Sequence, residues 1–133
     1  MRDRNPERNL IPFSTVKIIT DDDYTYGNFG FKDETGKIVV EPQYSSCGDY
    51  TYGLCPVAVQ SDVHAPGSNP YDDLRWGYID EKGKRVILCK YREAFSFNRY
   101  GIAVVRDEYD DNAYLIDRNG LTVFRKDNID FSR

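Results

Sequence analysis

A repeated stretch of alternating residues constrains the fold of this chain more than any other feature. Residues 76–91 begin with Trp-Gly-Tyr-Ile-Asp, pass through Glu-Lys-Gly and continue into a second apolar segment. Residues 29–44 show the same order without a gap, and residues 113–124 show a shorter third copy. Alternation with a period of two is typical of β-strands, and regular repetition is typical of stacked units. The sequence therefore predicts an all-β repeat protein.

Each copy combines strand-forming segments with turn residues. The shared Asp-x-x-Gly spacing predicts equivalent turns in which Gly36, Gly83 and Gly120 adopt a positive φ. We expect three-stranded antiparallel units, with about nine strands, in an open or partly closed array. The chain is expected to form one domain over residues 1–133, with units at about 13–41, 54–89 and 101–125. The expected strands are 13–20, 27–32, 37–41, 54–60, 75–80, 84–89, 101–107, 113–117 and 121–125.

The alternation also predicts which aromatic side chains lie between the units. Trp76 is expected to be largely buried there, with Tyr78 and Phe31 at equivalent positions.

The repeated pattern resembles the WG-repeat (KWG) family over roughly residues 15–125. The resemblance is strongest at residues 76–91, whereas the first copy has Phe29 in place of Trp and Lys32 in place of Ile. The resemblance implies a repeated β architecture and a binding or scaffolding role. It carries over no catalytic residues.

Acidic residues concentrate in the connections between successive copies. Segments 20–27, 61–74 and 107–112 hold 10 of the 22 acidic residues and no Lys or Arg. If the units pack in the same orientation, these segments share one edge, which would attract a basic protein. The opposite turns contain Lys37, Lys82, Lys84, Arg85 and Arg118, so the two edges are expected to differ in sign. The expected partner-binding residues are Asp21, Asp22, Asp23, Tyr24, Tyr71, Asp72, Asp73, Asp107, Glu108, Tyr109, Asp110 and Asp111.

No sequence motif points to catalysis. The chain lacks a nucleophile elbow, an HExxH motif and a phosphate-binding glycine loop, so we expect neither an enzyme nor a cofactor. The Asp runs lack calcium-loop spacing and His64 is the single histidine, which argues against a metal site. Scattered basic residues disfavour nucleic-acid binding.

The three cysteines, Cys47, Cys55 and Cys89, are expected to be reduced and mostly buried.

The sequence contains neither a membrane-spanning apolar run nor an apolar signal segment, so a cytoplasmic location is expected.

The acidic connections and the absence of catalytic motifs favour a protein–protein interaction module that binds a basic partner. One concrete form is an immunity or inhibitor protein that covers the cationic active site of a bacterial toxin, such as a nuclease. The alternative is a small-molecule or glycan-binding module, in which exposed Trp76, Tyr78, Tyr91 and Tyr100 would stack on the ligand.

Overall fold

The computed structural model describes residues 9–19, 24–60, 73–107 and 112–125. These residues form eleven strands, and no helix occurs among them. Accordingly, the described part of the chain has no helix that could cross a membrane.

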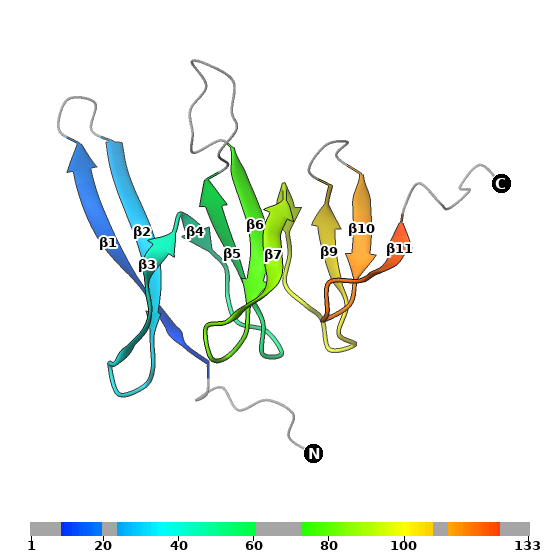
Figure 1. The fold of residues 1–133 in the computed structure, drawn as a ribbon, viewed down its shortest axis with the longest axis horizontal. Helices are drawn as coiled ribbons and strands as arrows, with labels where there is room; N and C mark the ends of the chain where they lie inside the picture. Colours follow the sequence, from blue (N-terminus) through cyan, green and yellow to red (C-terminus); the bar gives the residue numbers. More distant parts are fainter. Residues whose placement is uncertain (1–8, 20–23, 61–72, 108–111, 126–133) are drawn as a thin grey trace.

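The strands form three open antiparallel sheets that stand in a row (Figure 1). The first sheet has the order β1-β2-β3, the second β4-β5-β6-β7 and the third β11-β10-β9-β8. This arrangement confirms the predicted all-β array of antiparallel units. The strands are β1 (Ile11–Ile19), β2 (Tyr24–Lys32), β3 (Ile38–Tyr44), β4 (Ser46–Cys47), β5 (Cys55–Gln60), β6 (Leu74–Ile79), β7 (Arg85–Tyr91), β8 (Glu93–Ala94), β9 (Ala103–Arg106), β10 (Ala113–Ile116) and β11 (Thr122–Arg125).

The short strands β4 and β8 were not predicted, and they give the second and third sheets a fourth strand. Each follows the last strand of one sheet and pairs with the next sheet, β4 with β5 and β8 with β9. The backbone bond from Ser45 N to Ala58 O (2.8 Å) extends the first pairing, and the bond from Arg92 N to Arg106 O (3.1 Å) extends the second. Two-residue strands are too short to show an alternating pattern in a sequence.

The Asp-x-x-Gly turns have the predicted geometry. The φ values are 91° at Gly36, 83° at Gly83 and 84° at Gly120, in the left-handed region that glycine tolerates. In the second turn, Asp80 Oδ1 accepts hydrogen bonds from the backbone N–H groups of Lys82 and Lys84, both at 2.9 Å. The aspartate side chain therefore holds the turn that the glycine makes possible.

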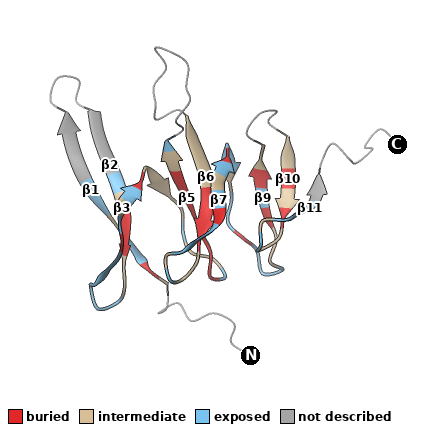
Figure 2. Cartoon of the chain, viewed as in Figure 1, coloured by how far each residue is buried: buried red, intermediate tan, exposed pale blue. Residues whose placement is uncertain are grey.

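Two clusters of buried side chains fill the spaces between adjacent sheets, as the red segments in Figure 2 indicate. Two neighbouring residues of β6 belong to different clusters. Tyr78 faces the third sheet, and Ile79 faces the first. The predicted equivalence of Tyr78 and Phe31 is confirmed, since both are fully buried and pair with Ile87 and Val40 respectively.

The prediction that Trp76 belongs to the core between units is confirmed in part, because it packs against that core without being fully buried. Trp76 is half-buried and packs against the margin of the cluster between the second and third sheets. It lies two residues nearer the start of β6 than Tyr78, and it pairs with Tyr91. Its equivalent in the first copy is Phe29, which is also half-buried and pairs with Tyr44.

The Asp-x-x-Gly turns of the second and third repeats lie against the preceding sheet. A Cβ atom on Gly83 would lie 2.4 Å from Val40 Cγ2, and one on Gly120 would lie 3.4 Å from Ile87 Cγ1. Val40 and Ile87 occupy equivalent positions in β3 and β7. A Cβ on Gly36, in the first turn, would meet no atom within 4 Å. The same turn is therefore tightly packed in the second repeat and open in the first.

Two tyrosines, half-buried Tyr50 and fully buried Tyr78, lead to a prediction about alkaline stability. Burial raises the pKa of both Tyr50 and Tyr78 far above its usual value. The unfolded chain should release these protons near pH ~10 while the folded chain retains them, so the free energy of unfolding should fall as pH rises above that value. Urea unfolding below and above this pH, followed by far-ultraviolet circular dichroism, measures the effect, and tyrosinate absorbance follows the proton release. A free energy of unfolding that stays constant would contradict this prediction.

Candidate functional site

The strand ends that flank the three acidic segments lie at one edge of the molecule. These are the paired ends of β1 and β2, of β5 and β6, and of β9 and β10, at the top of Figure 1. We call this side the loop edge; it is defined by the end pairs Ile19–Tyr24, Gln60–Leu74 and Arg106–Ala113. All three sheets thus present the same pair of strand ends on the same side.

Most of the predicted partner-binding residues fall outside the described part of the chain. Tyr24 is the first residue of β2, although only its backbone is described. The residues outside the described ranges are Asp21, Asp22, Asp23, Tyr71, Asp72, Glu108, Tyr109, Asp110 and Asp111.

The two described carboxylates of the loop edge bind neighbouring side chains. Asp73 Oδ1 lies 2.6 Å from Arg75 Nη1, in an ion pair whose side chains are 23% and 17% exposed respectively. Asp107 is half-buried and accepts a hydrogen bond from the Tyr114 hydroxyl. Asp73 therefore fixes the end of segment 61–74 to β6, and Asp107 fixes the start of segment 107–112 to β10.

The aromatic residues named for ligand stacking are mostly inside the protein. Tyr78 is 0% exposed and Tyr91 is 5% exposed, and both belong to the cluster between the second and third sheets. Trp76 is half-buried, whereas Tyr100 is 72% exposed. The stacking alternative, in which all four side chains are exposed, does not fit this arrangement, because strand alternation directs Tyr78 and Tyr91 into the core.

The three cysteines are free thiols, as predicted. Cys55 is fully buried in the cluster between the first and second sheets, and half-buried Cys47 and Cys89 pack against that cluster. Burial raises the pKa of all three thiols, which keeps them protonated and weakly nucleophilic. Among the described side chains, no group of three or more His, Cys, Asp or Glu is placed to hold a metal ion.

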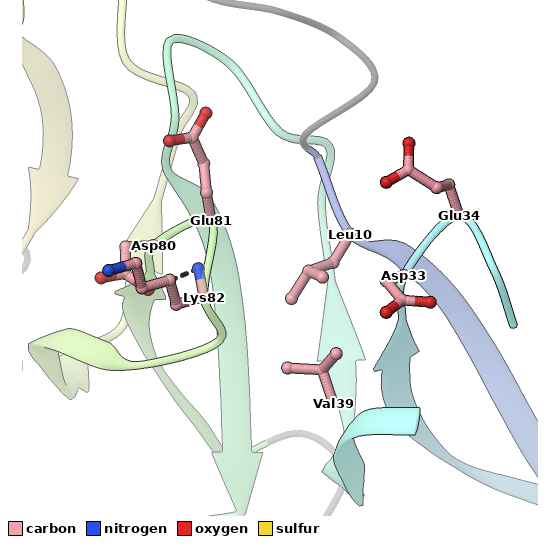
Figure 3. Close-up of a pocket in the computed structure, with 7 residues that line it drawn as sticks. All are labelled: Leu10, Asp33, Glu34, Val39, Asp80, Glu81 and Lys82. Atoms are coloured by element: carbon pink, nitrogen blue, oxygen red, sulfur yellow. Dashed lines mark hydrogen bonds between the residues drawn. The ribbon is translucent and has the colours of Figure 1, made fainter. Parts of the chain in front are cut away.

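A groove of 660 Å³ lies at the opposite edge, between the first two Asp-x-x-Gly turns. We call it the turn groove. In Figure 3, Glu34 and Glu81 stand on opposite sides, with the apolar side chains of Leu10 and Val39 between them. The lining residues are Leu10, Asp33, Glu34, Val39, Asp80, Glu81 and Lys82.

The turn groove brings together more negative than positive charge, although the turns at this edge were predicted to be basic. The aspartates are there because the turns need them. Asp33 Oδ1 accepts a 2.6 Å hydrogen bond from Thr35 Oγ1 and a 3.0 Å bond from Lys37 N. The Thr35 side-chain bond is the main cause that lowers the pKa of Asp33, which keeps this exposed carboxylate charged.

Sequence reasoning missed the turn groove, although a signal was present. Asp33-Glu34 and Asp80-Glu81 are acidic pairs at equivalent places in two matched repeats. What the sequence did not show is that Leu10, which precedes the first strand, is buried between the two turns (7% exposed).

Comparison with known families agrees with this architecture. A family model described as "WG containing repeat" matches residues 29–60 and 76–109. The first match runs from within β2 through β5, and the second runs from within β6 through β9. Neither the curated proteins nor the solved structures gave a match to this chain.

Proposed function

Because this chain is a WG-repeat protein, we propose that it is a non-catalytic protein–protein interaction module that binds a basic partner through the loop edge. It acts in the cytoplasm as an immunity or inhibitor protein, and its target is a bacterial toxin such as a nuclease. The acidic segments 20–27, 61–74 and 107–112 supply the binding surface.

The observation that carries this proposal is the common direction of the strand ends. Each acidic segment leaves and re-enters its sheet at the loop edge, so the segments start and finish on one side of the row of sheets (Figure 1). Three acidic segments attached along one side favour a cationic partner by steering its approach. A nuclease suits this role because its active site is built to attract negatively charged phosphates.

The stacking alternative receives less support, since Tyr78 and Tyr91 are buried. It would have to rely on Tyr100 and on the exposed part of Trp76.

The test compares two charge reversals of equal size. Asp21→Lys/Asp23→Lys changes the loop edge, whereas Glu41→Lys/Asp49→Lys changes two exposed residues outside the acidic segments and the turn groove. Tagged wild-type protein and both variants are used to capture proteins from the native host, and the captured partner is then purified for association kinetics. Asp73 and Asp107 are left unchanged because they hold Arg75 and Tyr114.

The loop-edge variant should associate roughly tenfold more slowly or worse, and its rate should depend less on salt, because rim charges mainly steer the encounter. The control variant should associate like wild type. If the captured partner is a toxin, wild-type protein should inhibit its activity. Equal association rates for the wild type and the folded loop-edge variant would exclude the loop edge as the binding surface.

A further inference from the structure

The turn groove combines an apolar floor with carboxylates on both walls. Leu10 (7% exposed) and Val39 (41% exposed) form the floor. The walls come from two different repeats, with Asp33 and Glu34 on one side. Asp80 and Glu81 stand on the other side (Figure 3). The groove therefore presents a small apolar surface between two charged walls.

The charges of the groove define the chemistry that fits it. Its lining has four carboxylates and one ammonium group, that of Lys82. Within the described part of the chain, neither Glu34 nor Glu81 forms a salt bridge. A cationic group entering the groove would therefore meet carboxylates on both sides. An arginine or lysine side chain also brings an aliphatic stem that can lie on an apolar floor.

The groove is not a general product of the repeat. The third turn has Arg118 at the place of Glu34 and Glu81, and the Arg118 guanidinium donates a hydrogen bond to the backbone carbonyl of Tyr52. The space between the second and third turns therefore has a cation where the turn groove has a carboxylate.

We infer that the turn groove docks an extended protein segment in which an arginine or lysine stands next to an apolar residue. The basic side chain lies between Glu34 and Glu81, and the apolar residue contacts Val39. This site is at the opposite edge from the loop edge, so it is independent of the proposed function and would give the protein a second contact with a partner.

The test uses a fluorescein-labelled Arg-Leu-Arg-Leu peptide and measures its binding by fluorescence anisotropy. A labelled Glu-Leu-Glu-Leu peptide is the matched control ligand and should not bind. Glu34→Lys/Glu81→Lys should weaken binding of the basic peptide by about tenfold or more, because two attractive pairs become repulsive. Both glutamates lie beside the aspartates that hold the turns, so the turn hydrogen bonds of Asp33 and Asp80 remain. Glu34→Gln/Glu81→Gln is a milder variant, and it should weaken binding in the same direction.

Two further variants separate the groove from general charge effects. Glu41→Lys/Asp49→Lys has the same charge change outside the groove and should bind the peptide like wild type. Val39→Thr removes apolar surface from the floor without adding charge, and it should also weaken binding of the peptide. The inference is overturned if the Glu41→Lys/Asp49→Lys control weakens binding as much as Glu34→Lys/Glu81→Lys. It is also overturned if spermidine displaces the peptide as well as unlabelled peptide does, since the site would then recognise any cation.

The loop edge provides the last comparison. Asp21→Lys/Asp23→Lys should leave binding of the Arg-Leu peptide unchanged, even if that variant loses the partner of the proposed function. A parallel loss of peptide binding would assign the peptide to the loop edge and would overturn the inference.

Discussion

Tyr78→Ala should lower the free energy of unfolding by about 3–5 kcal/mol, the usual cost of removing a fully buried aromatic ring. The Tyr78 side chain is 0% exposed, and its ring centroid lies 4.8 Å from that of Phe97 at an interplanar angle of 67°. Its hydroxyl donates a 2.6 Å hydrogen bond to the backbone carbonyl of Phe95. The substitution would therefore remove packing and a hydrogen bond that join the second sheet to the segment entering the third.

Two further variants show how much of this loss in the free energy of unfolding comes from the hydroxyl group and how it compares with the loss at Trp76. Tyr78→Phe keeps the ring and removes the hydroxyl, so it should cost about 1 kcal/mol. Trp76→Ala removes a larger side chain that is only half-buried, and it should cost less than Tyr78→Ala. Urea unfolding of the three variants measures the order. A greater loss for Trp76→Ala than for Tyr78→Ala would mean that Trp76 is the principal aromatic of this core.

Gly83→Ala should destabilise the protein by about 2–4 kcal/mol, through backbone strain together with overpacking. The φ of 83° disfavours any residue with a Cβ, and that atom would lie 2.4 Å from Val40 Cγ2. Gly36→Ala is the matched control, because its φ of 91° is similar but a Cβ there would meet nothing within 4 Å. Gly36→Ala should therefore cost only about 1 kcal/mol, the strain alone.

The difference between these two glycine variants measures the contact of one repeat with the next. Gly120→Ala should fall between them, since a Cβ at that position would lie 3.4 Å from Ile87 Cγ1. Chemical denaturation of all three variants under one condition gives the series. Equal losses at Gly36 and Gly83 would show that the turn of the second repeat moves away from Val40 at little cost.

The parts of the fold that depend on local chemistry could be predicted from the sequence. Alternation around Tyr78 located β6 and its equivalent β2, and the Asp-x-x-Gly spacing located three turns with positive φ. The half-burial of Trp76 could not be derived in this way. Alternation identifies the face of a strand on which a side chain lies, whereas exposure also depends on how far along the strand the neighbouring sheet extends.

The candidate sites were also predictable only where they depend on local sequence. The sequence showed that three acidic segments recur between the repeats, and the strand ends that flank them do share one edge. The roles of Asp73 and Asp107 could not be predicted from the sequence. The sequence does not distinguish an aspartate that binds Arg75 or Tyr114 from one that is solvated. The turn groove depends on Leu10, which lies outside the repeated pattern and contacts it only after folding.

The sequence repeat and the sheet have different boundaries. The short strands β4 and β8 lie where each repeat passes from one sheet to the next. The matched segment 29–60 supplies β2 and β3 to one sheet and β4 and β5 to the next, and segment 76–109 does the same one sheet further on. A single repeat cut at its sequence boundaries therefore contains two half-sheets and no complete one. The missing halves come from β1 at one end and from β10 and β11 at the other. We expect longer or shorter proteins of this design to fold when whole repeats are added or removed at the acidic connections, provided that both terminal half-sheets are kept.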